Sequence, residues 1–240
     1  MQDFFANCAT VLQKYGFSYL RGAGTTLLLA LVGTFFGCLI GFAVGALQTI
    51  PIDKQRDPVW KRVLLKILHI FLRCYVELFR GTPMIVQAVV IYYGLLQVFG
   101  IKMGMWQAGF FIVSINTGAY MAETVRGGIV SIDPGQTEGA KAIGMNHWQT
   151  MLHVILPQAL RTAFPTLAST LIAMVKDTSL AANITVTEML MTTQRIVART
   201  YEPLALYIEV GIIYLLFCTV LTRLQAVGER YLNSKGAQRS

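Results

Sequence analysis

Two groups of polar residues in apolar surroundings could bind a small polar solute. Asn116, Tyr120 and Glu123 are spaced by four and three residues, so a helix would place them on one face. A carboxylate removed from water needs a partner, and the ammonium group of a zwitterionic solute could be that partner for Glu123. The open alternative is that Glu123 pairs with Arg126, three residues further along the same helix.

The carboxylate of the same solute would need hydrogen-bond donors. Lys176, Thr178 and Ser179 follow an apolar stretch broken by prolines, and their side chains can donate. The candidate substrate-binding residues are therefore Asn116, Tyr120, Glu123, Lys176, Thr178 and Ser179.

The sequence has no grouping that is typical of an enzyme. It has no GxxxxGK[ST] phosphate-binding loop, no HExxH motif, and no Ser/His/Asp or Cys/His grouping. The cysteines Cys8, Cys38, Cys74 and Cys218 are far apart, which indicates neither a metal site nor a disulfide framework. We expect no catalytic residue, metal or cofactor in this chain.

A polar helical passage lies between long apolar stretches at residues 138–157. Thr137 could cap a short helix, Glu138 would sit at the positive end of its dipole, and Gly144 could end it in the left-handed conformation. Asn146 and Gln149 have the capping-box spacing, so a second helix should begin at once and run to Pro157. The first helix has a slim profile that could lie in a groove of another protein, because it contains Gly139, Ala140 and Ala142.

Composition places the chain in a membrane. Of its 240 residues, 55% are hydrophobic and 13% are charged, and the mean hydropathy is +0.56. The net charge of +8 comes from scattered basic residues without interleaved aromatic ones, which favours lipid head groups over nucleic acid.

Five spans are predicted, at residues 22–50, 81–101, 103–122, 151–175 and 203–222. The first has Gly33, Gly37, Gly41 and Gly45 at every fourth position, a ridge that would let another helix approach closely. The helix of the third should end at a break at Gly127-Gly128, and the fourth should be interrupted at Pro157, Arg161 and Pro165. Residues 63–80 read as a helix with one polar stripe, made of His69, Arg73, Glu77 and Arg80, at the interface or against protein. Residues 176–200 are polar and could fold back into the membrane.

Basic residues set the predicted orientation. Residues 51–66 contain five basic residues against two aspartates, so this loop should be cytoplasmic, with the amino terminus outside and the basic carboxyl terminus inside. The five are Lys54, Arg56, Lys61, Arg62 and Lys66.

Four separated motifs resemble the permeases of the polar amino-acid uptake family of ATP-binding-cassette (ABC) importers. They are ELFRGTP at residues 77–83, NTGAYMAETVRGG at 116–128, the passage from Glu138 with Gly144 six residues later and Leu156-Pro157 beyond, and KDTSL at 176–180. One position departs from the family's "EAA" pattern, because Gly139 stands where alanine is usual.

The resemblance implies an all-α, polytopic membrane protein with the transmembrane domain of a type I ABC importer. The whole chain, 1–240, would be one permease domain, with a coupling loop at about 127–150 that contacts the ATPase through Glu138, Gly139, Ala140, Ala142 and Gly144. The implied partners are two ATPase subunits that bind ATP and Mg²⁺, a second permease copy or a sister permease, and an extracytoplasmic amino-acid-binding protein. The setting would be a prokaryotic inner membrane, and the function ATP-driven import of polar amino acids.

A different class of transporter is the alternative. In a secondary transporter or channel, intramembrane carboxylates such as Glu123 and Glu209 would relay protons or ions. That alternative leaves the polar passage from Glu138 unexplained.

Overall fold

The computed structural model describes residues 2–55 and 57–237, with side chains described at residue 10 and from 13 to 230 except at 56. Within these residues the regular structure is helical and contains no strand. In chain order the elements are α1 (Gln2–Gln48), α2 (Val59–Gly81), α3 (Met84–Phe99), α4 (Met105–Val130), α5 (Pro134–Ala142), α6 (His147–Thr150), a π-helical turn (Met151–Ile155), α7 (Leu156–Asp177), a 3₁₀ helix (Thr178–Ile184), α8 (Met189–Thr200) and α9 (Pro203–Ala237).

The closest helix contact is between α1 and α4. A Cβ atom added to Gly41 would lie 2.2 Å from the Cβ of Met121, a separation that real side chains do not reach. A Cβ atom at each of the other three glycines of the ridge would also clash with α4, one turn further along both helices. The predicted glycine ridge is therefore confirmed, and its partner is α4. The other pairs are Gly33 with Val113, Gly37 with Thr117 and Gly45 with Val125.

The main core lies around this contact. It gathers fully buried apolar side chains from α1, α4, α7 and the 3₁₀ helix after α7, among them Leu29, Ile112, Val113, Val175 and Ile184. Burial of this kind is worth roughly 1.5–3 kcal/mol for each large side chain, so this cluster fixes α4 and α7 against α1.

Two of the described helices are long and apolar enough to cross a membrane: Gln13–Gln48 within α1 and Pro203–Arg230 within α9. The pair α2 and α3 would be a third crossing if it were one broken span, and it bends by 112°. The length predicted for the span at 81–101 is wrong. The helix there, α3, has 16 residues and reaches only about 24 Å, short of a hydrocarbon core of about 30 Å. The five-span count and the orientation stay predictions.

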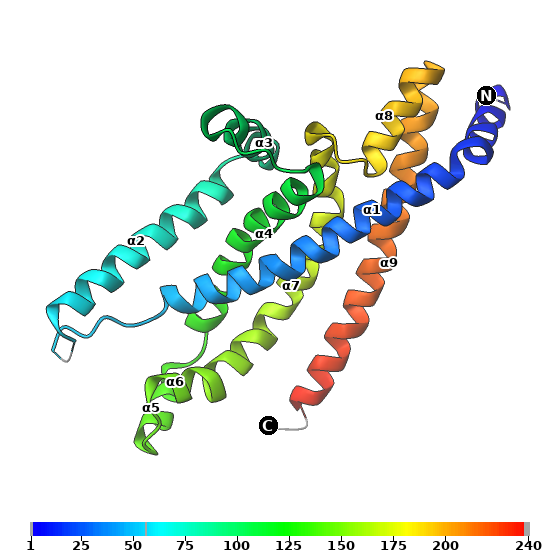
Figure 1. Cartoon of the computed structure of the whole chain (residues 1–240). Helices are drawn as coiled ribbons and strands as arrows, with labels where there is room; N and C mark the ends of the chain where they lie inside the picture. The colour runs from blue at the N-terminus through cyan, green and yellow to red at the C-terminus, as the bar shows by residue number, and fades with distance from the viewer. Residues whose placement is uncertain (1, 56, 238–240) are drawn as a thin grey trace.

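The two ends of the molecule are distinct. Figure 1 shows the N-terminal end of α1 with α3 and α8 toward the top, and α5, α6 and the C-terminal end of α9 toward the bottom. The N-terminus and the polar passage therefore lie at opposite ends, as the predicted orientation requires.

The start of α5 differs from the expectation. Asp133 caps the helix by accepting a hydrogen bond from the N–H of Gly135 at 2.6 Å, and Pro134 takes the first helical position. Thr137 and Glu138 are inside the helix, so neither begins it. An Asp-Pro pair is a stronger start signal than threonine, because proline has no N–H to leave unpaired.

Two segments in which we expected a break are continuous helices. α4 runs through Gly127 and Gly128 to Val130, and a Cβ at Gly128 would meet the carbonyl oxygen of Ala159 at 3.0 Å, so Gly128 serves close packing. The helix from α6 to Asp177 is not interrupted at Pro157, Arg161 or Pro165. A π-helical turn before Pro157 absorbs the missing hydrogen bond, and Pro165 lies inside α7.

Residues 176–200 form no span. The 3₁₀ helix Thr178–Ile184 and then α8 follow α7, and the 3₁₀ helix packs against α3. α8 lies against α1 and α9.

Candidate functional site

Two neighbouring clefts share the residues Arg80 and Glu123. The first, here called the α2 cleft, has a volume of about 420 Å³ and lies between α2, α4 and the end of α1. The second, the α7 cleft, has a volume of about 470 Å³ and lies between α4 and α7. Polar side chains line the α2 cleft, chiefly His69, Arg73, Glu77, Arg80, Glu123 and Arg126.

The sequence of α2 explains the α2 cleft. His69, Arg73, Glu77 and Arg80 recur at three- or four-residue spacing, so they share the face turned to α4, while apolar side chains such as Phe71 are exposed on the outside. The Nε2 atom of His69 lies 3.1 Å from the carbonyl oxygen of Leu47, which ties α2 to the end of α1.

Glu123 forms an ion pair with Arg126. Nη2 of Arg126 donates to Oε1 at 2.6 Å and Nε donates to Oε2 at 3.1 Å, so the pair is bidentate. The sequence left two interpretations of Glu123 open, and the structure shows the one in which Glu123 pairs with Arg126. Both carboxylate oxygens already have a cationic partner.

Tyr120 lies beside this pair. The guanidinium of Arg80 is 5.7 Å from the centre of the Tyr120 ring, a cation–π contact between α2 and α4. Tyr120 and Glu123 line the α7 cleft together with Arg80, and the remaining polar side chains there are hydroxyls from Thr124, Ser131, Thr162, Thr166 and Thr170.

Asn116 lies behind the clefts and lines neither. It is 3% exposed, and its Nδ2 donates to Oε1 of Gln87 at 2.8 Å. Gln87 in turn donates to the carbonyl oxygens of Phe79 and Thr82, both at 2.9 Å. Asn116 thus holds the corner between α2 and α3 against α4.

The second predicted group is not brought to the clefts. Lys176, Thr178 and Ser179 lie at the end of α7 and line neither cleft. Thr178 is fully buried, and its hydroxyl donates to the carbonyl oxygen of Val175 at 2.9 Å. In this conformation the hydroxyl of Thr178 is not open to a ligand.

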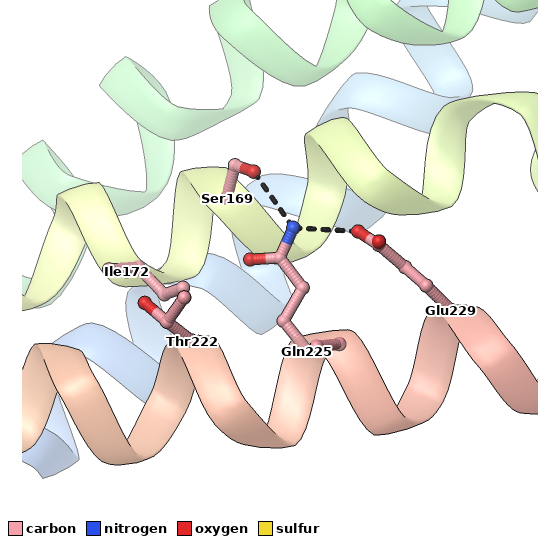
Figure 2. A pocket seen from close by; sticks show the side chains of 6 residues that line it. Ser169, Ile172, Thr222, Gln225 and Glu229 are labelled. Atoms are coloured by element: carbon pink, nitrogen blue, oxygen red, sulfur yellow. Dashed lines mark hydrogen bonds between the residues drawn. The ribbon is translucent and has the colours of Figure 1, made fainter.

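A further groove, between α7 and α9, has polar groups that satisfy one another. Figure 2 shows the Gln225 amide between Ser169 and Glu229, and its Nε2 donates to them at 3.1 and 2.8 Å. The same nitrogen reaches the carbonyl oxygen of Pro165 at 3.3 Å. This groove therefore joins two helices and leaves few groups for a ligand.

Sequence reasoning missed Arg73 and Arg80 as site residues and missed Glu188 altogether. The sequence shows the polar stripe on α2, but it does not show that the stripe faces α4, because α4 is distant in sequence. Glu188 is fully buried and caps α8, accepting from the N–H groups of Leu190 and Met191 at 2.8 and 2.6 Å. An acid just before an amphipathic helix was the available signal.

The polar passage forms a capped elbow. Gly144 has a φ of +83°, and the N–H of Met145 donates to the carbonyl oxygen of Ala140 at 3.0 Å, which closes α5. Asn146 and Gln149 exchange reciprocal side-chain hydrogen bonds, both 2.9 Å long, so the predicted capping box is confirmed.

Much of the elbow surface is exposed. Ala140 is buried, whereas Glu138, Gly139, Ala142 and Gly144 are exposed. The side chains of Ile143 and Trp148 are 80% and 59% exposed. Two large apolar side chains therefore lie open on the surface of the elbow.

The sequence and the fold have known relatives. Residues 60–233 match the family described as binding-protein-dependent transport system inner membrane component. The chain is 33% identical over 228 residues to a probable amino-acid ABC transporter permease protein, YckA, of Bacillus subtilis, covering 95% of this chain and 94% of the relative. It is 33% identical over 204 residues to the glutamine transport system permease protein GlnP of Escherichia coli, covering 85% and 87%.

A solved structure agrees with the sequence matches. The fold matches a chain in the crystal structure of an amino acid ABC transporter with histidines, with a TM-score of 0.81, 31% identity and coverage of 92% of this chain and 97% of that chain. The fold is therefore that of the transmembrane domain of a type I ABC importer. The chain belongs to the family of binding-protein-dependent inner membrane transport components, which confirms the resemblance, the fold class and the membrane location predicted from the sequence.

Proposed function

We propose that this chain is the permease subunit of an ATP-driven importer of polar amino acids. The main support is the elbow at Gly144, which is fixed by caps on both sides and exposes Ile143 and Trp148 beside a helix continuous to Asp177. Similarity to amino-acid permeases over nearly the whole chain supports the same function.

The elbow is the proposed contact with the ATPase. Closure of two ATPase subunits would push α5, and the unbroken helix from α6 through α7 would pass that movement to the α7 cleft as a rigid element. ATP and Mg²⁺ would bind to the ATPase, and this chain would catalyse nothing itself. A second permease copy or a sister permease, and an extracytoplasmic binding protein at the opposite end, complete the proposed assembly.

The substrate path proposed here passes the two clefts. Tyr120 and Glu123 line it, and Asn116 positions α4 from behind. Roles for Lys176, Thr178 and Ser179 would require another state of alternating access. Substrate-stimulated ATP hydrolysis of Asn116→Leu, Glu123→Gln and Ser179→Ala complexes tests this path, and wild-type substrate dependence in all three would exclude it.

A secondary transporter is the second candidate, and one observation favours it. Glu209 in α9 is 8% exposed, and both of its carboxylate oxygens are buried without a hydrogen-bond partner among the residues that the structure describes. A buried carboxylate of this kind can take up and release a proton.

Reconstitution separates the two functions. The chain is placed in proteoliposomes with an ATPase subunit and a binding protein encoded beside it, and uptake of labelled amino acids is measured. The proposal expects uptake that needs ATP inside and survives collapse of the ion gradients. Uptake driven by a gradient without ATP or the ATPase would establish the alternative instead.

A further inference from the structure

The α2 cleft has an unbalanced set of charges. Three guanidinium groups and the His69 imidazole face two carboxylates across it. Arg126 and Glu123 neutralise each other through their bidentate pair. The groups that remain are Arg73, Arg80 and Glu77 on α2.

Arg73 and Arg80 form no salt bridge with the described residues, because no carboxylate oxygen lies within 4.0 Å of either guanidinium group. Arg80 lies over the face of Tyr120 and interacts at longer range with Glu123, whose two oxygens are already held by Arg126. The apolar outer side of α2, with Ile67, Ile70 and Phe71 exposed, favours a bilayer around this helix. Guanidinium groups at such a place need an anion or water.

An unpaired acceptor lies in the same cleft. Oε1 of Gln48 is buried and has no hydrogen-bond partner among the described residues. Together with the carboxylate of Glu77, it could accept hydrogen bonds from an ammonium group.

We propose that the α2 cleft binds an amino acid with two carboxylates, so that the permease itself selects acidic over neutral and cationic substrates. The inference rests on the proposed importer function and adds the substrate class. Arg73 and Arg80 are seven residues apart, about two helical turns, and their long side chains can converge on two carboxylates of one ligand. The ammonium group of that ligand lies against Gln48 and Glu77.

A cationic side chain in the same place would meet two unpaired guanidinium groups. A neutral amide side chain would replace a charge-assisted hydrogen bond to one guanidinium group with a weaker neutral one. Glutamate and glutamine have nearly the same shape, so their difference in affinity measures the charge preference alone.

The test is equilibrium binding of labelled glutamate, glutamine and lysine to the permease–ATPase complex in lipid nanodiscs, without a binding protein. We expect glutamate to bind at least tenfold more tightly than glutamine, and lysine not to displace it. Arg73→Gln and Arg80→Gln should each weaken glutamate binding at least tenfold and change glutamine binding less than threefold. Glu77→Gln should weaken glutamate and glutamine binding alike, because the ammonium group of both ligands loses its carboxylate acceptor.

Two controls keep the outcomes distinct. Arg195→Gln removes an exposed arginine of α8 that does not line the cleft and should leave binding unchanged, and Arg80→Lys should restore part of the affinity. Equal or tighter binding of glutamine or lysine, or wild-type binding in both arginine variants, overturns the inference even if ATP-driven uptake of some amino acid occurs. Absence of ATP-driven uptake of every amino acid would instead overturn the importer function.

Discussion

The hydroxyl of Tyr214 donates a hydrogen bond to the carboxylate of Glu188 across 3.0 Å, which joins α9 to the first turn of α8. The same carboxylate caps α8 and lies 3.5 Å from the hydroxyl of Thr26 on α1. One buried acid thus connects three helices that meet at the end of the molecule opposite the elbow.

Glu188→Ala should destabilise this junction. The lost cap costs about 1 kcal/mol, and the buried hydroxyl of Tyr214, left without its acceptor, adds about 1–3 kcal/mol. Thermal unfolding in detergent should therefore show a clearly lower melting temperature. Glu202→Ala, at an exposed acid between α8 and α9, is the matched control, and an equal loss in both variants would contradict the role given to Glu188.

Gly41→Ala should lower the stability of the permease by about 1–3 kcal/mol. The new Cβ would lie 2.2 Å from the Cβ of Met121, so α1 and α4 would have to separate. Gly24→Ala on the same helix meets nothing within 4 Å and should be neutral or slightly stabilising. The melting temperatures of the two variants are compared, and a Gly41→Ala protein as stable as Gly24→Ala would show that the helices are not in contact there.

Gly144→Val should uncouple ATP hydrolysis from uptake. A φ of +83° is open to glycine and costs a β-branched residue about 1–2 kcal/mol or more, so the elbow would shift. Uptake per ATP hydrolysed in proteoliposomes is the measurement. Gly139→Ala has free space around its Cβ inside α5 and should keep normal coupling. Wild-type coupling in Gly144→Val, with normal ATPase binding, would remove the elbow from the mechanism.

The orientation can be tested by labelling single cysteines in a cysteine-free background. A cysteine at Lys54, in the basic loop, should react with an impermeant reagent only from the cytoplasmic side. Arg56, the centre of that loop, lies outside the described residues. A cysteine at Glu202, at the opposite end of the fold, should react only from outside. The reverse pattern, or labelling of both from one side, would refute the predicted topology.

Local signals in the sequence predicted local structure well. The capping box at Asn146, the left-handed turn at Gly144 and the ridge from Gly33 to Gly45 all follow from short spacings and are present in the structure. The break predicted at Gly127-Gly128 was wrong, because the close contact of Gly128 with α7 outweighs the low helix propensity of glycine. The span predicted at 81–101 was wrong in length, because hydropathy does not register the sharp corner at Pro83.

The candidate site was harder to predict for a related reason. Spacing placed Tyr120 and Glu123 on one face, but it could not tell that Arg126 would hold Glu123 or that Asn116 would be held by Gln87. It also gave no means to see that Arg80, forty residues earlier than Tyr120, would stack on its ring. Such pairings depend on how α2 packs on α4.

The glycine ridge limits which parts of the permease can move. Gly33, Gly37, Gly41 and Gly45 each receive a side chain of α4, so α1 could slide along α4 only in whole steps of four residues, about 6 Å. A ratchet of that size would break every contact at once. The two helices therefore behave as one rigid unit, and the path can open only through movement of the elements packed around that unit.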